Sequence, residues 1–241
     1  MALKLINILA FAIMILMNYL ANALPLGGNT TGELSARYPN LFVPAGLTFS
    51  IWGVIYLLLL GFVILQFRPE NRILANTTGW LFAASCLLNA LWIVAWHYQR
   101  PGISLLIMIL LLICLILINR NLISFETGIS KAAFGIYLGW ICIATIANAT
   151  AWLVSVNWAG WGLSGELWAT AMVIAGAAIT VFVLASFKNP FTGLAVIWAL
   201  AGIIIARSWP GHSPIIISAA ISAVIIAVFS AMITARIFRG A

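Results

Sequence analysis

Long apolar runs are the feature that most limits how this chain can fold. Of its 241 residues, 65% are hydrophobic and only 6% are charged, whereas soluble domains average roughly 45–50% apolar and about 25% charged residues. A helix of about 20 mostly apolar residues crosses the hydrocarbon core of a bilayer, which is roughly 30 Å thick. The sequence therefore predicts an all-α, multi-pass membrane protein whose surroundings are the lipid bilayer.

Apolar runs bounded by charged residues, Pro or Gly predict about eight transmembrane helices packed as a bundle. Two of these runs, 103–118 and 191–206, are short for a membrane span. The eight runs are residues 3–24, 44–67, 78–98, 103–118, 132–156, 167–187, 191–206 and 214–237.

The distribution of Lys and Arg predicts how the helices are oriented, because cytoplasmic loops carry an excess of basic residues. With the N-terminus in the cytoplasm, eight crossings place most basic residues inside: Lys4, Arg68, Arg72, Arg120, Lys131, Lys188, Arg236 and Arg239. Three remain outside, namely Arg37, Arg100 and Arg207. Both termini are therefore expected in the cytoplasm.

The first run also resembles a cleaved signal peptide, because Lys4 precedes a long apolar stretch that ends in Ala21-Asn22-Ala23. A retained helix is favoured by the length of the run and by the charge alternation, which an odd number of helices would disturb. We therefore expect residues 1–23 to form the first transmembrane helix.

Several function classes are excluded by what the chain lacks. Its basic residues sit singly between apolar runs, so no nucleic-acid surface is expected. Cys86, Cys114 and Cys142 do not have the spacing of a zinc or redox site. Away from the run ends there is no acidic residue, His, Lys or Arg, so ion-coupled transport and hydrolytic catalysis lack the groups that they need. His97 and His212 are expected at an interface or in a loop, with contact to a ligand as the alternative.

Amide and aromatic side chains remain inside the runs. Residues three or four apart share a helix face, and a buried amide in hydrocarbon needs a partner. Three aromatic stripes are therefore expected to face one another or a ligand. They are Phe49, Trp52 and Tyr56; Asn89, Trp92 and Trp96; and Tyr137, Trp140, Ala144, Asn148 and Trp152.

The alternative is that aromatic residues form interfacial belts and asparagines only join helices. We favour it for the tryptophans at run ends and in loops: Trp80, Trp96, Trp158, Trp161, Trp168 and Trp209. Thr77 and Thr78 are expected to cap the third helix with their hydroxyl groups. The last run carries a seam of small residues for close packing, within the bundle or against a second subunit: Ala219, Ala223, Ala227, Ala231 and Ala235.

Three segments together have the order and spacing of a known family. They are Pro44-Ala45-Gly46 leading to Phe49, Trp52 and Tyr56; Leu88-Asn89-x-x-Trp92; and Tyr137-Leu138-x-Trp140 followed by Ala144, Asn148 and Trp152. This pattern resembles the TspO/MBR family of tryptophan-rich sensory or translocator proteins. The resemblance covers residues 1–156 as a five-helix membrane bundle and leaves residues 157–241 as an additional three-helix membrane segment.

The resemblance implies a membrane sensor or binding protein, not an enzyme, for a hydrophobic or amphipathic ligand. Tetrapyrroles such as porphyrin and haem, or sterol-like molecules, are the implied classes; no cofactor is required, and a homodimer is the implied assembly. Residues 25–42 would form a lid, with Arg37 available to a ligand carboxylate. The implied cavity is lined by Pro44, Phe49, Trp52, Tyr56, Asn89, Trp92, Tyr137, Trp140, Ala144 and Asn148.

The chain also departs from the family pattern. Leu47 stands where the family has Trp, and Phe49 is one residue closer to Trp52 than the pattern requires. Residues 153–162 lack the basic residue of a cholesterol-type motif, so sterol binding through that motif is not expected. Two other functions stay open: a transporter or permease for an apolar molecule, completed by the last three helices, and light-driven breakdown of a bound tetrapyrrole.

Overall fold

A computed structural model describes residues 1–23, 28–125 and 128–239. Within these ranges the chain forms nine α-helices and no strand. Seven helical segments of the described chain are long and apolar enough to cross a membrane, and an eighth apolar helix, α8, is shorter. The predicted all-α membrane bundle is thus confirmed.

The helices follow one another along the chain with short connections. They are α1 (Ala2–Ala23), α2 (Thr31–Ala36), α3 (Ile51–Leu65), α4 (Arg72–His97), α5 (Pro101–Asn121), α6 (Ile129–Ser155), α7 (Gly165–Phe187), α8 (Phe191–Ile205) and α9 (Ser213–Arg239). A 3-10 turn, η2 (Gly46–Ser50), leads into α3, and η3 (Pro69–Asn71) leads into α4.

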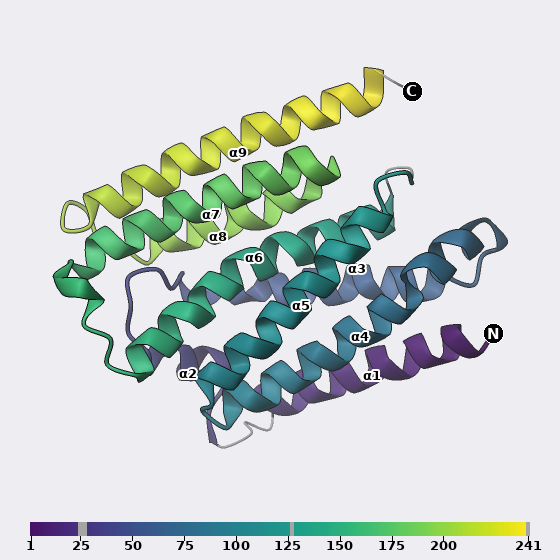
Figure 1. Cartoon of the computed structure of the whole chain (residues 1–241), viewed down its shortest axis with the longest axis horizontal. Helices are drawn as coiled ribbons and strands as arrows, with labels where there is room; N and C mark the ends of the chain where they lie inside the picture. The colour runs from purple at the N-terminus through teal and green to yellow at the C-terminus, as the bar shows by residue number, and fades with distance from the viewer. Residues whose placement is uncertain (24–27, 126–127, 240–241) are drawn as a thin grey trace.

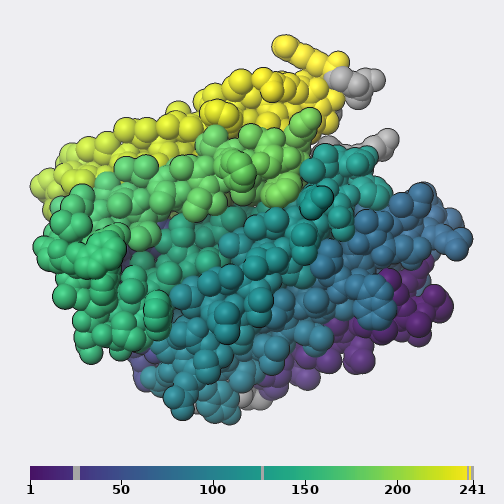
Figure 2. Space-filling view, in the orientation of Figure 1, coloured from purple at the N-terminus to yellow at the C-terminus, as the bar shows by residue number. Residues whose placement is uncertain are grey.

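Two groups of membrane helices lie against each other (Figure 1). In the first group α1 packs on α4, α4 on α5, and α6 on both α5 and α3. In the second group α9 packs on α7 and α8. Helix α8 also packs on α6 and so joins the two groups, which form a continuous surface in the space-filling view (Figure 2).

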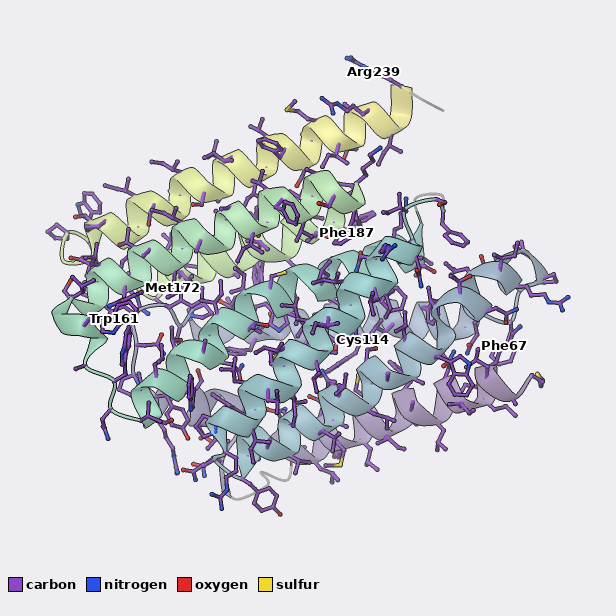
Figure 3. The ribbon with its side chains drawn as sticks, viewed as in Figure 1. Phe67, Cys114, Trp161, Met172, Phe187 and Arg239 are labelled. Carbon is purple, nitrogen blue, oxygen red and sulfur yellow. The ribbon has the colours of Figure 1, made fainter. Side chains whose placement is uncertain are left out.

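The beginning of α1 and the end of α9 lie at the same end of the bundle, as an even number of crossings requires (Figure 1). We name this the inner end, after the predicted orientation, and the opposite one the outer end. Phe67 and Arg239 lie toward the inner end and Trp161 toward the outer end (Figure 3).

Helices α4 and α5 exceed their predicted runs by the largest margin. Helix α5 begins at Pro101, where a missing N–H costs nothing in the first turn, and it continues to Asn121. Helix α4 begins at Arg72, so the predicted cap at Thr77 and Thr78 is wrong. Both hydroxyl groups instead donate to carbonyls one turn earlier, those of Ile73 and Leu74 at 2.8 Å. Polar residues are tolerated in the first turns of a membrane helix when these turns extend beyond the hydrocarbon.

Helix α8 has only 15 residues, and its length of roughly 22 Å is less than the hydrocarbon thickness. A short helix is tolerated where protein, not lipid, surrounds its ends. At the inner end, buried Asn189 donates to Oδ1 of Asn119 at 3.0 Å and to the carbonyl of Lys131 at 2.9 Å. These bonds attach the start of α8 to α5 and α6.

Small residues allow α8 to approach its neighbours closely. A Cβ on Gly139 of α6 would overlap the carbonyl oxygen of Thr192, and one on Gly193 would overlap the hydroxyl of Ser230 in α9. The predicted alanine seam contributes less. Of its five members only Ala219 is fully buried, while Ala227, Ala231 and Ala235 are exposed on the outside of the described bundle.

We predict that Gly139→Ala lowers the free energy of unfolding by about 1–3 kcal/mol, because the added methyl group must displace the α8 backbone. Gly53→Ala is the matched control, since nothing lies within 4 Å of a Cβ at Gly53 in α3. Reversible unfolding in mixed micelles measures both. Equal stability of the two variants would contradict this account of the α6–α8 contact.

Candidate functional site

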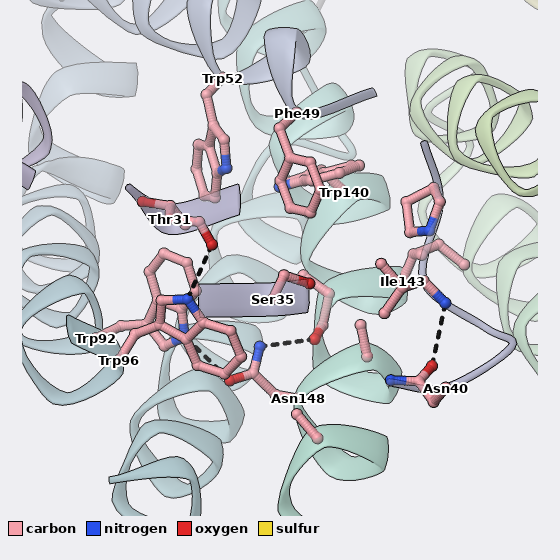
Figure 4. Close-up of a pocket in the computed structure, with 15 residues that line it drawn as sticks. Thr31, Ser35, Asn40, Phe49, Trp52, Trp92, Trp96, Trp140, Ile143 and Asn148 are labelled. Carbon is pink, nitrogen blue, oxygen red and sulfur yellow. Dashed lines mark hydrogen bonds between the residues drawn. The ribbon is translucent and has the colours of Figure 1, made fainter. Parts of the chain in front are cut away.

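A cavity near the outer end is surrounded by the aromatic residues that the sequence singled out (Figure 4). Its walls come from α2, the segment 40–44, η2, α3, α4 and α6. The lining residues are Thr31, Ser35, Asn40, Val43, Pro44, Phe49, Trp52, Trp92, Trp96, Trp140, Ile143, Ala144, Ala147, Asn148 and Ala151.

Trp52 of α3 is the centre of the aromatic wall. Its ring stacks on Trp92 with centroids 6.1 Å apart and on Tyr56 at 5.5 Å, and it meets the edges of Tyr137 at 5.8 Å and Trp140 at 6.1 Å. Rings at these separations attract one another beyond the burial of their surfaces, by about 0.5–1.5 kcal/mol per pair. Three transmembrane helices therefore meet at one indole.

The wall extends toward the outer end in a second row of rings. Trp96 stacks on Trp92 with centroids 6.2 Å apart, and Tyr38 tilts against Trp96 at 5.7 Å. Phe49 meets Trp140 edge-on at 5.9 Å. The cavity thus has flat walls on several sides.

The amide oxygen of Asn148 is hydrogen-bonded to two neighbouring helices. Its Oδ1 accepts a hydrogen bond from Nε1 of Trp92 at 3.2 Å and from Oγ of Ser104 at 2.7 Å. Its Nδ2 donates to the carbonyl of Ala144 at 3.0 Å. Asn148 therefore fixes the Trp92 indole and joins α6 to α4 and α5.

Asn89 makes a second such link, deeper in the bundle. Asn18 of α1 donates to its Oδ1 at 2.7 Å, and Asn89 donates to the hydroxyl of Tyr137 in α6 at 3.0 Å. Asn89 and Tyr137 are completely buried, so both polar groups have their partners inside the protein.

Two donors near the cavity have no partner among the described residues. They are Nε1 of Trp140, which lines the cavity, and the hydroxyl of Tyr56. A buried donor without an acceptor costs about 1–3 kcal/mol, so an acceptor group on a bound molecule would be stabilised at either position.

The cavity is small in this conformation. Its volume is about 40 Å³, and one water needs roughly 10–15 Å³. A second cavity of about 170 Å³ shares Thr31, Phe49 and Trp52 with the first and also contacts Tyr56. These three shared side chains form the partition between the two spaces.

Helix α2 closes the cavity from the outer end. A capping box starts it, in which Thr30 and Glu33 bond each other's backbone N–H, and these bonds lower the pKa of Glu33 below its usual value. Nε1 of Trp96 donates to the Thr31 carbonyl at 3.3 Å, and the Thr31 hydroxyl is hydrogen-bonded to Nε2 of His97 at 3.2 Å. The end of α4 thus holds α2 over the aromatic wall.

Comparison with known proteins identifies the family. A family model described as "TSPO-like protein" matches residues 4–233. The chain belongs to the TSPO-like family. The match continues past residue 156 through the last three helices, which the sequence resemblance did not reach. Neither curated proteins nor solved structures gave a match.

This TSPO-like protein brings seven of the ten predicted site residues to one cavity: Pro44, Phe49, Trp52, Trp92, Trp140, Ala144 and Asn148. Tyr56 lines the second cavity. Asn89 and Tyr137 line neither space; they lie below the Trp52 ring and join helices.

Other cavity residues were not predicted. The spacing of four from Trp92 put Trp96 in a predicted stripe, but its place near a run end favoured an interfacial position. It is only 6% exposed and lines the cavity. His97 is buried rather than in a loop. Thr31 and Ser35 come from α2, for which the Thr30-x-x-Glu33 capping box was an available signal.

The predicted lid is described from residue 28 onward, and residues 25–27 lie outside the described ranges. Arg37 is exposed, and its guanidinium donates to Oδ1 of Asn29 at 2.8 Å. Among the described residues no group of three or more His, Cys, Asp or Glu could hold a metal ion.

We predict that Asn89 and Tyr137 are energetically coupled. In a double-mutant cycle of Asn89→Ala and Tyr137→Phe, the coupling free energy should be about 0.6–2 kcal/mol, because the bond lies inside the membrane region. Asn121→Ala is the control, since its bond to the Thr77 carbonyl is exposed and its loss should cost less than 0.5 kcal/mol. Additive effects of Asn89→Ala and Tyr137→Phe would contradict the link.

Proposed function

We propose that this TSPO-like protein is a non-catalytic membrane sensor or binding protein for a flat hydrophobic or amphipathic molecule. A tetrapyrrole is the favoured ligand class, and a sterol-like molecule is the second. The wall of rings around Trp52, with the unpartnered Nε1 of Trp140 beside it, is the observation that carries the proposal.

Flat aromatic ligands suit such a wall because they stack on indole and phenol rings over a large area. A few fixed polar groups then orient the ligand. Since Asn148 is committed to Trp92 and Ser104, the orienting donors in this proposal are Nε1 of Trp140 and the hydroxyl of Tyr56.

A tetrapyrrole requires more room than the closed cavity gives, so binding requires a movement. Thr31 and Ser35 of α2 occupy the outer side of the cavity, and Thr31 also borders the second space. Outward movement of α2 would take Thr31 out of the partition and enlarge both spaces beside Trp52. The proposed lid is therefore α2 and the residues beside it.

Binding is better supported than transport. Below the aromatic wall, the fully buried rings of Phe62, Phe82 and Phe134 pack with centroids 4.9–6.0 Å apart. This packing fills the space between α3, α4 and α6 on the inner side of the site. Saturable uptake of protoporphyrin into proteoliposomes would favour a transporter instead.

Two further parts of the proposal concern placement and assembly. Both termini are placed in the cytoplasm because eight of the eleven Lys and Arg residues lie in the segments of the inner side. For a homodimer, the exposed part of the alanine seam on α9 offers a surface that a second backbone can approach closely.

We predict that protoporphyrin binds saturably and quenches tryptophan fluorescence. Trp140→Phe keeps a ring but removes the free N–H, so the dissociation constant should rise about 3–10-fold. Trp140→Ala also removes the stacking surface and should raise it by about 10–100-fold. Titrations of the purified protein in detergent, followed by porphyrin absorbance and residual tryptophan fluorescence, measure both changes.

Trp80→Phe is the matched control, because Trp80 is 64% exposed on α4 and lines none of the described cavities. It should lower the total fluorescence without changing the dissociation constant. The proposed ligand class is wrong if the unaltered protein shows no saturable binding. The proposed site is wrong if Trp140→Ala binds as tightly as the unaltered protein.

A further inference from the structure

Residues 40–44, here called the wall segment, separate the aromatic cavity from two larger spaces at the outer end. Asn40, Val43 and Pro44 line the cavity, and the segment has no helix or strand of its own. On its other sides lie a space of about 510 Å³ that reaches Arg207 and one of about 370 Å³ walled by Trp158 and Trp168. Asn40 borders all three spaces.

Arg207, directly after α8, binds the backbone of the wall segment. Nε donates to the carbonyl of Leu41 at 2.9 Å, and Nη2 donates to the carbonyls of Val43 at 2.8 Å and Asn40 at 3.3 Å. Nη1 donates to the carbonyl of Ala206 at 3.0 Å. One guanidinium therefore binds three carbonyls of the wall segment, which the planar fork of arginine permits and a lysine does not.

The guanidinium charge of Arg207 interacts with these backbone carbonyls. No Asp or Glu of the described residues lies within ion-pair distance of Arg207, and partial burial lowers its pKa from the usual value while leaving it charged at neutral pH. Its position between α8 and the wall is thus set by backbone dipoles.

Helix α8 holds the continuation of the wall segment as well. The N–H of Ala45 donates to the carbonyl of Gly202 at 2.9 Å, and Nε1 of Trp198 donates to the carbonyl of Thr48 at 2.9 Å. Thr48 fits against Gly202 so closely that a Cβ there would overlap its side chain. The chain from the wall segment to Phe49 and Trp52 is therefore aligned by α8.

We propose that Arg207 is a positioning residue that keeps the wall segment closed and so sets how fast a ligand reaches the aromatic cavity. The proposal rests on the proposed binding function of that cavity. It gives the last three helices a role, because α8 presents Arg207, Gly202 and Trp198 to the wall and is itself held by α6 and α9. Release of the wall segment joins the small cavity to the two larger spaces beside it.

Stopped-flow mixing of the full chain in nanodiscs with protoporphyrin tests this role. Arg207→Gln is expected to raise the association and dissociation rate constants at least 10-fold each, with the dissociation constant changed less than 3-fold. Arg207→Lys should give an intermediate result. Arg100→Gln, which changes another arginine of the outer end, is the control and should leave the rates unchanged.

Hydrogen exchange without ligand separates this proposal from the binding function. In Arg207→Gln the amides of Phe42, Val43 and Ala45 should exchange at least 10-fold faster than in the unaltered protein, whether or not protoporphyrin binds. The proposal is overturned if the amides of Arg207→Gln exchange at the unaltered rate. It is also overturned if they exchange faster while the association and dissociation rate constants stay unchanged. If protoporphyrin does not bind the unaltered protein, the proposed binding function is wrong. The exchange rates of Arg207→Gln then still test whether Arg207 positions the wall segment.

Trp198→Phe provides a milder variant if Arg207→Gln does not fold, because it removes a single bond to the Thr48 carbonyl. It should raise both rate constants about 2–5-fold, in line with the loss of one neutral hydrogen bond. Rates equal to those of the unaltered protein in both Trp198→Phe and Arg207→Lys overturn the proposal.

Discussion

A side-chain amide inside a bilayer has no water to bind, so its partners decide how the helices around it are rotated. In this protein Asn89 accepts from Asn18 and donates to Tyr137, while Asn148 accepts from Trp92 and Ser104. These bonds join α1, α4, α5 and α6. Asn89 fixes one face of α4, and the indole of Trp92, three residues on, points toward the same interior. The indole of Trp152, four residues after Asn148, does not follow this pattern, because it is 40% exposed. The aromatic cavity is thus a consequence of polar pairing in hydrocarbon.

The same logic explains how the two helix groups work together. The first group supplies the rings, but the cavity is closed by segments that have little regular structure or are very short, namely α2 and the wall segment 40–44. Such segments need external support to remain in one position. Trp96 and His97 support α2, and Arg207 supports the wall segment. The second helix group therefore contributes to the site without lining the cavity itself.

Sequence patterns were sufficient where a rule acts locally along one helix. Run length and charge gave the membrane bundle, and the spacing of three or four residues gave most of the cavity wall. The start of α4 was misplaced because Arg72 and Asn76 look like a loop, although polar residues are allowed in a helix that extends beyond the bilayer. The contacts of Arg207 with Leu41 join residues 166 positions apart, and no local pattern encodes such a pair. Whether an asparagine faces a ligand or another helix is likewise decided by its neighbours in space.

The hydrogen bonds of the asparagines to other helices also affect which ligand would suit the cavity in the proposed function. With the amide oxygens of both asparagines bonded to neighbouring helices, the buried donors beside the site that have no partner among the described residues are Nε1 of Trp140 and the hydroxyl of Tyr56. A pure hydrocarbon would leave these donors unsatisfied and so would gain only stacking and burial. A molecule with acceptor atoms at its edge, such as a carboxylate, a carbonyl or a ring nitrogen, would gain both. Under the proposed binding function, such a cavity would select molecules with acceptor groups on a flat apolar body, and this selectivity would require no charge inside the membrane.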